Sequence, residues 1–489
     1  MIHPYAHALR RAASRSPDSL AVVELVGNTS TTWGELEDGA SRVAQHLIDS
    51  GVRPDDRVIV HQSNTLAYIQ TILAVAWCGA VAVPALSILS RDELDYITTE
   101  IQPTATIDPI QDVPRMLFAN RCEPRDGNGE SISQILYTSG SSGRPKGVVH
   151  QYASTAAAMA GWLSISKISP GDVALVSSPI SHASGRLFEA VLLADATVAI
   201  SCNSRAKSVL SAIQQTSTTH LIVVPTVLAD LVNDEEFESY DLSSLRFVLY
   251  ASAPASPTLI SRAQELFGPI IHTVYGSTEA PTPITHLDPA DHLRATTTNP
   301  ELLLSCGRES EWGCQINILN DFGDAVADDE LGQLAIWSPA LAHTYWQQPD
   351  LWSQRLLGDW FLTGDIARRH EGFIFLSDRK DDMIITGGFN VFPTEVENHI
   401  AAHQLVYEVA VVGIPDTRWG EAIVAVVSGD PSLTDSNILT WCQSALSRHK
   451  IPKRVLIVDE LPKTGHGKVS RRAVREHFFA GADAIHGAG

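Results

Sequence analysis

Short runs of β-branched and aliphatic residues recur along the chain and are the feature that most limits its fold. They include RVIV at 57–60, TVAI at 197–200, LIVVPT at 221–226, LRFVLYA at 245–251 and IIHTVYG at 270–276. Helical or polar stretches separate them. A clear helix pattern precedes the first run at 32–50, where Thr32 and Glu35 form a capping-box pattern before apolar residues at helical spacing. Continuous apolar strands that alternate with helices are typical of sheets buried on both faces. The sequence therefore predicts an α/β fold.

The chain length and a change in composition predict more than one domain. Single hydrophobic cores stop growing near ~250–300 residues, and this chain has 489. After about residue 378 charges and glycines crowd together, and two strand patterns follow, VAVVGI at 409–414 and IVAVVSG at 423–429. We predict a large domain of layered sheets and helices over 1–378, a hinge at 379–381 and a small mobile α+β domain over 382–489. Thr394 and Glu397 predict a second capping box at a helix start.

Charge and cysteine usage narrow the partners and the compartment. The formal net charge is −21, which argues against a nucleic-acid surface and against an anionic membrane surface. The apolar run at 69–86 carries Gln70 and Pro84 near its ends, so a buried helix followed by a strand fits it better than a membrane span. The first residues lack the apolar core of a signal peptide. The cysteines are scattered without zinc spacing, which favours reduced thiols in a cytoplasmic protein.

One loop pattern points to an anion. ILYTSGSSGRPKGVVH, residues 135–150, is a strand-like run followed by glycines, serines and a lysine. Small residues let backbone N–H groups converge on phosphate oxygens, and Lys146 adds positive charge. The spacing does not fit a Walker A loop. Taken alone, the pattern would also fit a flexible glycine–serine turn.

The whole string resembles the signature of the adenylate-forming enzymes. These are the acyl- and aryl-CoA synthetases, the adenylation domains of non-ribosomal peptide synthetases and firefly luciferase, whose usual form is close to YTSGTTGxPKGV. Four further motifs of this family follow in order and extend the resemblance over essentially the full chain: YGSTE at 275–279, TGD at 363–365, DRKDDMIITGGFNVFPTEVE at 378–397 and LPKTGHGKVSR at 461–471. The closest pattern is that of the aryl- and acyl-CoA ligases.

The resemblance implies a set of ATP-binding residues. The phosphate loop would supply Thr138, Ser139, Gly140, Ser141, Ser142, Gly143 and Lys146. In YGSTE, Tyr275 would stack on adenine beside Gly276 and Ser277, Thr278 would contact the α-phosphate, and Glu279 would hold Mg²⁺. Asp365 resembles the ribose ligand, since a carboxylate can accept hydrogen bonds from both ribose hydroxyls. Arg379 resembles a second ribose or phosphate contact.

The resemblance also implies a moving catalytic lysine. Lys468 matches the essential adenylation lysine, a mobile point charge that can bridge the carboxylate and the α-phosphate. Asp381 matches the hinge about which the small domain rotates. Gly387 and Gly388 match a glycine turn that lies beside the pantetheine tunnel in thioester-forming relatives.

Residues 177–200 match the segment that lines the acyl pocket in these relatives. His182 matches a histidine beside the carboxylate that gates the pocket, and the absence of the aspartate typical of peptide synthetases disfavours an α-amino acid. Arg186 departs from the usual apolar residue. A buried arginine needs a partner, which is either Glu189 or another acid of the chain, or a second anionic or polar group on the substrate. The small residues Ala251, Ser252 and Ala253 leave room for a flat ring or chain.

These patterns predict an enzyme that uses ATP and Mg²⁺ to activate a small carboxylic acid as an acyl-AMP, with release of pyrophosphate. A pantetheine thiol, of CoA or of phosphopantetheine on an acyl carrier protein, would then take the acyl group. Alternatives are a non-thiol acceptor, a non-carboxylic acid, or a catalytically silent nucleotide-binding protein. A silent protein would be expected to lose Lys468, Glu279 or Asp365, and all three are present. The oligomeric state stays open.

Overall fold

The structure is a computed structural model of the whole chain. It describes residues 2–87, 89–127, 129–138, 145–181, 184–201, 203–253, 255–379, 382–463 and 469–479.

The largest sheet gathers strands from both ends of the large domain. Its order is β15-β16-β19-β20-β14-β13-β12-β11-β10-β8-β9-β1-β2, with β18 paired to β19. Strands β12, β11, β10, β8 and β9 are mutually parallel, as predicted for alternating strands and helices. The strands are β1 Leu20–Glu24, β2 Thr29–Thr32, β8 Val173–Val176, β9 Thr197–Ile200, β10 His220–Val223, β11 Phe247–Tyr250, β12 Ile271–Tyr275, β13 Thr285–Leu287, β14 Arg308–Glu309, β15 Gln315–Leu319, β16 Gly332–Trp337, β18 Leu356–Leu357, β19 Trp360–His370 and β20 Phe373–Arg379.

A second sheet has the order β17-β7-β6-β4-β3-β5. Strands β3, β4, β5 and β6 pair in parallel, and β6 turns back into β7 as an antiparallel hairpin. Its strands are β3 Arg57–His61, β4 Val81–Ala85, β5 Ala105–Ile107, β6 Ile132–Thr138, β7 Lys146–Gln151 and β17 Thr344–Tyr345.

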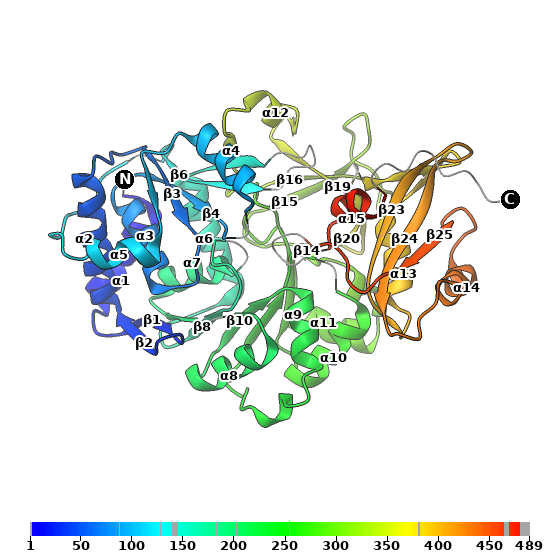
Figure 1. Cartoon of the computed structure of the whole chain (residues 1–489), viewed down its shortest axis with the longest axis horizontal. Coiled ribbons are helices and arrows are strands. Elements are labelled where there is room, and N and C mark those ends of the chain that lie inside the picture. The colour runs from blue at the N-terminus through cyan, green and yellow to red at the C-terminus, as the bar shows by residue number, and fades with distance from the viewer. Residues whose placement is uncertain are drawn as a thin grey trace.

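Helices cover both sheets, and one core joins them (Figure 1). That core contains residues of both sheets together with α1, α2, α3, α6 and α7, whereas α8, α9 and α10 pack on the far side of the large sheet. The predicted capping box at Thr32 and Glu35 is present at the start of α2. The helices of this part are α1 Pro4–Arg15, α2 Trp33–Asp49, α3 Leu66–Trp77, α4 Arg91–Ile101, α5 Pro109–Met116, α6 Tyr152–Ser166, α7 Gly185–Ala194, α8 Ala206–Thr216, α9 Pro225–Val232, α10 Pro257–Phe267, α11 Pro289–Thr297 and α12 Pro349–Ser353.

A third, smaller sheet follows residue 382 and lies at the C-terminal end of the molecule (Figure 1). Alternate residues of β24 face two cores: Ile423, Ala425 and Val427 pack under α13 and α14, and Val424 and Val426 pack under α15. A sheet with apolar residues on both faces needs cover on both sides. The elements are β21 Ile384–Thr386, β22 Phe389–Val391, β23 Val406–Asp416, β24 Gly420–Gly429, β25 Arg454–Ile457, α13 Pro393–Ala401, α14 Asp435–Ala445 and α15 Arg471–Phe479.

The fold class is confirmed: a large α/β part of layered sheets and helices precedes a small α+β part. The boundaries at 378 and 382 stay a prediction. The second capping box was wrong, because α13 begins at Pro393 behind Phe392. The backbone N–H of Thr394 donates instead to Asp378, and Glu397 accepts from Arg471.

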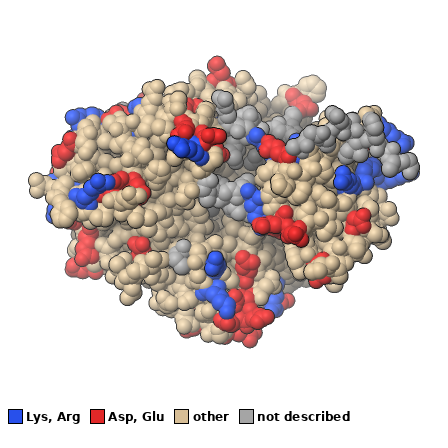
Figure 2. Space-filling view, viewed as in Figure 1, with Lys and Arg blue, Asp and Glu red and all other residues tan. Residues whose placement is uncertain are grey.

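Surface charge, helix polarity and the state of the cysteines complete the description of the fold. On the face in Figure 2, acidic and basic side chains are interspersed among uncharged ones. Within the described ranges, every helix is too short or too polar to cross a bilayer. The cysteines that the structure describes are free thiols, several of them buried.

Candidate functional site

Several motif residues follow parallel strands of the large sheet at one edge. The strands β11 and β12 pair in parallel, and their carboxyl ends lead into Ala251–Ala253 and into Gly276–Glu279. Carboxyl ends of parallel strands meet at the same edge, where ligands bind in open α/β sheets. Gly276 is required at its position, because an added Cβ would lie 2.8 Å from the carbonyl oxygen of Thr282. The turn is closed by Ser277, whose backbone and hydroxyl both bond Ala280 at 3.2 Å.

A cation and a carboxylate flank one tyrosine ring at this edge. Lys146 is buried and opens β7, paired with Thr138 across the hairpin that carries the predicted phosphate loop. Its Nζ lies 5.6 Å from the ring centroid of Tyr345, and the hydroxyl of Tyr345 donates to Glu279 Oε1 at 2.8 Å. Burial, reinforced by the charge of Glu279, raises the pKa of Tyr345, so the phenol keeps its proton. The second sheet thus contributes both the lysine and the tyrosine that meets Glu279.

His150 connects the phosphate hairpin to the YGSTE turn. It is fully buried on β7, and its Nε2 donates to the carbonyl oxygen of Thr278 at 2.9 Å. Burial, followed by the nearby positive charge of Arg186, lowers the pKa of His150 to about 3. The ring is therefore neutral at ordinary pH, and it fixes the backbone of the residue predicted to contact the α-phosphate.

The predicted adenine and ribose residues lie together. The hydroxyl of Tyr275 donates to Asp365 Oδ2, and burial followed by the charge of Asp365 raises the pKa of Tyr275. The backbone of Asp365 is held by the Thr363 hydroxyl at 3.0 Å. In the register of β19 and β20, Asp365 stands opposite Arg379. Tyr275 and Asp365, which are 90 positions apart in the chain, are thus in direct contact in the fold.

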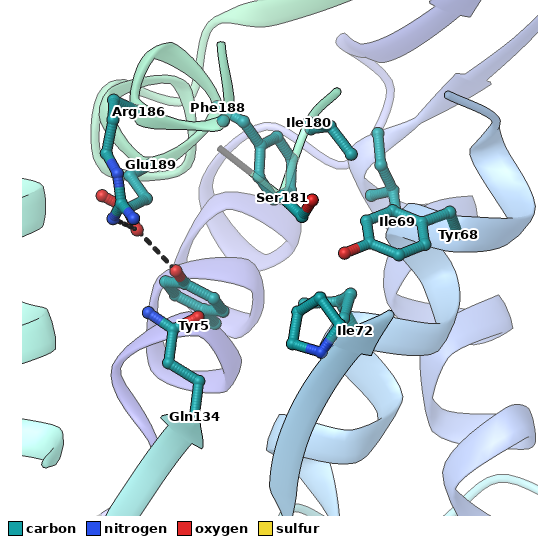
Figure 3. A pocket seen from close by; sticks show the side chains of 12 residues that line it. Tyr5, Tyr68, Ile69, Ile72, Gln134, Ile180, Ser181, Arg186, Phe188 and Glu189 are labelled. Atoms are coloured by element: carbon teal, nitrogen blue, oxygen red, sulfur yellow. Dashed lines mark hydrogen bonds and ion pairs between the residues drawn. The ribbon is translucent and has the colours of Figure 1, made fainter. Parts of the chain in front are cut away.

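The predicted acyl-pocket residues occupy two places. Ala251 is buried at the end of β11, followed by Ser252 and Ala253. Arg186 belongs to α7 and its guanidinium bonds Glu189 Oε1 at 2.7 Å. Burial opposes the charge of Arg186, but the charge and hydrogen bond of Glu189 together with Tyr5 raise the pKa of Arg186 above its ordinary value. The partner of the buried Arg186 is therefore the carboxylate of Glu189 (Figure 3), one of the alternatives that the sequence offered.

The glycine turn lies in the small sheet. Gly387 and Gly388 connect β21 and β22 and have φ of +58° and +82°. A two-residue hairpin with positive φ at both positions favours glycine. A side chain at Gly387 would lie 2.9 Å from the ring of Trp419, whose carbonyl accepts the Gly387 N–H at 2.7 Å.

Some predicted residues lie outside the described part of the chain. These are Ser139, Gly140, Ser141, Ser142 and Gly143 of the phosphate loop, His182, Asp381 and Lys468. For Arg379 only the backbone is described.

Two contacting residues escaped the sequence analysis. His150 lies inside the quoted phosphate-loop string, so its place near the motif was visible although its bond to Thr278 was not. Tyr345 lies 66 residues after Glu279 and belongs to no pattern. Tyr345 reaches the site through the pairing of β17 with β7, a contact between distant parts of the sequence. A local sequence pattern could not have indicated it.

The layered fold, the small C-terminal sheet and this set of charged groups define an adenylate-forming enzyme. Two family models match the chain, AMP-binding enzyme over residues 9–346 and AMP-binding enzyme C-terminal domain over 395–468. The chain belongs to the AMP-binding enzyme family.

Relatives narrow the class. A feruloyl-CoA synthase of Amycolatopsis sp is 33% identical over 490 residues, which cover 96% of this chain and 98% of that protein. The medium/long-chain-fatty-acid–CoA ligase FadD8 of Mycobacterium tuberculosis is 35% identical over 365 residues, 72% of this chain and 62% of that protein. The amide bond synthetase McbA from Marinactinospora thermotolerans has a similar structure, with a TM-score of 0.87 and 28% identity over 97% of this chain and 100% of that one. The chain is an AMP-forming acid–thiol ligase of the acyl- and aryl-CoA synthetase type, which activates a carboxylic acid as an acyl-AMP.

Proposed function

We propose that the acid is activated where the β6–β7 hairpin meets the YGSTE turn. The observation that carries this proposal is that Lys146 and Glu279 contact the same side chain, the lysine over the ring of Tyr345 and the glutamate at its hydroxyl. A buried lysine suits the leaving β- and γ-phosphates, and a carboxylate nearby suits a phosphate-bound cation. The loop residues 139–143 would complete the phosphate contacts.

The residues present fit a Mg²⁺ ion that arrives with the nucleotide. Mg²⁺ is commonly held by one or two carboxylates together with substrate phosphates. Among the described residues, no cluster of three or more His, Cys, Asp or Glu side chains could hold a metal ion. When bound, the ion would neutralise phosphate charge at the attack of the carboxylate. Glu279 would hold it, with Tyr345 fixing the orientation of the Glu279 carboxylate.

The nucleoside would lie between the end of β12 and the middle of β19. Tyr275 would stack on adenine, with Gly276 and Ser277 beside it, and Asp365 would accept hydrogen bonds from the ribose hydroxyls with Arg379 nearby. The bond between Tyr275 and Asp365 would orient that carboxylate. Thr278 would contact the α-phosphate, and His150 would hold its backbone in place.

The second step would use the other orientation of the small domain. Lys468 would bridge carboxylate and α-phosphate during adenylation and then withdraw as the domain turns about Asp381. Gly387 and Gly388 would then line the path of the pantetheine thiol of CoA. Closure over the site would protect the acyl-AMP from water. His182 would gate an acid that lies against Ala251, Ser252 and Ala253.

The test separates the two half-reactions. Lys468→Ala should abolish acid-dependent exchange of pyrophosphate into ATP and leave thioester formation from synthetic acyl-AMP largely intact. Lys207→Ala, which removes an exposed lysine paired with Glu236, serves as the matched control and should retain both. Equal loss of both half-reactions in Lys468→Ala would contradict the assigned role.

A second acceptor has support from one structural relative. The amide bond synthetase McbA is similar to this chain over almost its entire length, and its name states that it forms amides. An amine acceptor is therefore a second candidate, and a phosphopantetheine-bearing carrier protein is a third. Supplying CoA, a carrier protein or a simple amine to the preformed acyl-AMP, with products read by mass spectrometry, distinguishes the three.

The free thiols also favour a cytoplasmic location.

A further inference from the structure

The last turn of α4 carries a carboxylate that side chains from separate elements reach. Glu100 is half-buried, and its Oε2 accepts a hydrogen bond from the hydroxyl of Tyr137 on β6. Its Oε1 accepts from the hydroxyl of Tyr96, one turn earlier on α4, at 2.9 Å and from Gln348 Nε2 at 3.4 Å. The helix itself packs on the second sheet (Figure 1). Glu100 therefore joins α4 to the end of β6 and to the segment that follows β17.

The backbone of Glu100 contacts that same segment after β17. Its carbonyl oxygen accepts from Trp346 Nε1 at 3.3 Å and from Gln347 Nε2 at 2.9 Å. The last four carbonyl groups of a helix have no partner within the helix, so these donors satisfy one of them. The backbone N–H of Trp346 in turn donates to the carbonyl oxygen of Gly147 on β7 at 2.7 Å. Glu100 thus reaches β6 through Tyr137 and β7 through Trp346.

The ring of Tyr137 packs on the residue that follows Lys146. Tyr137 and Gly147 stand directly opposite in the β6–β7 hairpin. A Cβ added at Gly147 would lie 3.1 Å from Cζ of Tyr137 and 3.1 Å from Cβ of Trp346, so these two residues enclose the position. Burial, followed by the hydrogen bond to Glu100, raises the pKa of Tyr137. The phenol therefore keeps its proton and remains a donor to the carboxylate.

These contacts surround the lysine on both sides. Gly147 follows Lys146 directly, and Trp346 follows Tyr345, over whose ring the Lys146 ammonium lies at 5.6 Å from the centroid. A hydrogen bond to an ionised group is about twice as strong as one between neutral groups, so the bond from Tyr137 to Glu100 holds the tyrosine ring firmly. The position of Lys146 therefore depends on a carboxylate that belongs to a different helix.

We propose that Glu100 is a positioning residue for the β- and γ-phosphates of ATP. This rests on the proposed function, in which Lys146 binds those phosphates. The Glu100 side chain holds Tyr137 against Gly147 and so sets where the Lys146 ammonium lies. AMP has neither phosphate, so its binding does not depend on this arrangement. A residue that only stabilised the fold would instead affect the binding of both nucleotides alike.

The experiment compares the binding of ATP and of AMP to the purified full chain by isothermal titration calorimetry, with Mg²⁺ present and no acid. In Glu100→Ala the Kd for ATP should rise about tenfold while the Kd for AMP stays within about twofold, since misplacing a group by about 1 Å can cost up to about a hundredfold. Asp95→Ala, which removes an exposed carboxylate from the same helix, is the matched control and should leave both values unchanged. Equal weakening of both nucleotides, or an unchanged Kd for ATP, overturns the proposal.

A second variant tests the route through the tyrosine. Tyr137→Phe keeps the ring over Gly147 and removes only the bond to Glu100, so it should also weaken ATP and spare AMP. Because the two residues act through one bond, the double variant should lose less ATP affinity than the product of the two single losses. Full additivity would overturn this route.

A third variant separates this proposal from the proposed function. Lys146→Ala should raise the Kd for ATP and leave that for AMP unchanged. An unchanged Kd for ATP in Lys146→Ala would count against the phosphate site itself. A raised Kd in Lys146→Ala together with an unchanged Kd in Glu100→Ala would overturn the positioning role alone.

Discussion

The guanidinium of Arg471 lies 2.5 Å from the carboxylate of Asp378, although the two residues belong to different parts of the fold. Asp378 is on β20 of the large sheet, and Arg471 opens α15 on the small one. Arg471 also bonds Glu397 on α13 at 2.5 Å, and the backbone of Thr394 donates to Asp378 at 2.7 Å. These bonds reach across the proposed hinge at Asp381. They belong to the orientation of the small domain in this structure and would be strained or exchanged by a rotation there.

The first prediction concerns this ion-pair cluster. Arg471→Ala should lower the free energy of unfolding by about 3–5 kcal/mol, because it removes the cation that pairs with two acidic side chains at once, the buried Asp378 and Glu397. Chemical denaturation measures the change. Arg472→Ala is the neighbouring control, since Arg472 forms an exposed pair with Glu476 that is worth about 0–1 kcal/mol. Equal effects of the two substitutions would show that the cluster does not stabilise the fold.

The second prediction concerns the hydroxyl of Tyr345. Tyr345→Phe keeps the ring packed against Trp352 but removes the bond to Glu279. If Glu279 holds the cation, its carboxylate becomes less well oriented, and the Mg²⁺ concentration for half-maximal pyrophosphate exchange should rise about tenfold. Removing Mg²⁺ with a chelator should abolish exchange in both proteins. An unchanged Mg²⁺ dependence in the variant would separate Tyr345 from the metal.

The third prediction assigns the ribose contact. Asp365→Ala should lower kcat/KM for ATP by at least about tenfold, because hydrogen bonds to a carboxylate are lost. The same substitution should cost much less when 2′-deoxy-ATP or 3′-deoxy-ATP replaces ATP, since one of those bonds is then already missing. The comparison is made by measuring pyrophosphate release with each nucleotide at a saturating concentration of the carboxylic acid substrate. Identical losses with all three nucleotides would place Asp365 away from the ribose.

The fourth prediction concerns mild acid. Burial lowers the pKa of His150 to about 3, of His272 to about 2 and of His292 to about 4. The folded state therefore binds fewer protons than the unfolded state below pH 6.5. Stability is complete above that pH and falls as the pH drops toward the folded values, by about 1.4 kcal/mol per pH unit for each histidine. Urea unfolding at pH 7, 6 and 5 should show this slope.

A variant tests the source of that slope. His272 lies between Phe247 and His286, with its Nδ1 2.8 Å from His286 Nε2. Replacing it with phenylalanine removes one titrating group and should make the dependence of stability on pH shallower by about one proton. A slope identical to that of the wild type would contradict the assignment to His272.

Patterns among neighbouring residues of the sequence predicted much of the fold and part of the site. The helix at 33–49 and the strands after it follow from periodicity, because those signals depend on neighbours in sequence. Long-range contacts had no such signal. The pairing of β17 with β7, which brings Tyr345 to Glu279, and the diversion of Thr394 and Glu397 to Asp378 and Arg471 depend on tertiary packing. The Arg186–Glu189 pair was anticipated as one option for Arg186, and the structure places the two residues three positions apart on α7, where side chains are neighbours.

The β6–β7 hairpin has a consequence for how such an enzyme can change over generations. Thr138 stands opposite Lys146, and side chains on a strand alternate between two faces. An insertion or deletion of one residue at the start of β7 would shift the strand register. Lys146 would then face the other side of the strand, away from Tyr345, with its charge buried elsewhere. The loop between these strands can therefore exchange one small residue for another more readily than the two strands can change their register. We therefore expect the β6–β7 hairpin to vary among relatives by substitutions rather than by insertions or deletions.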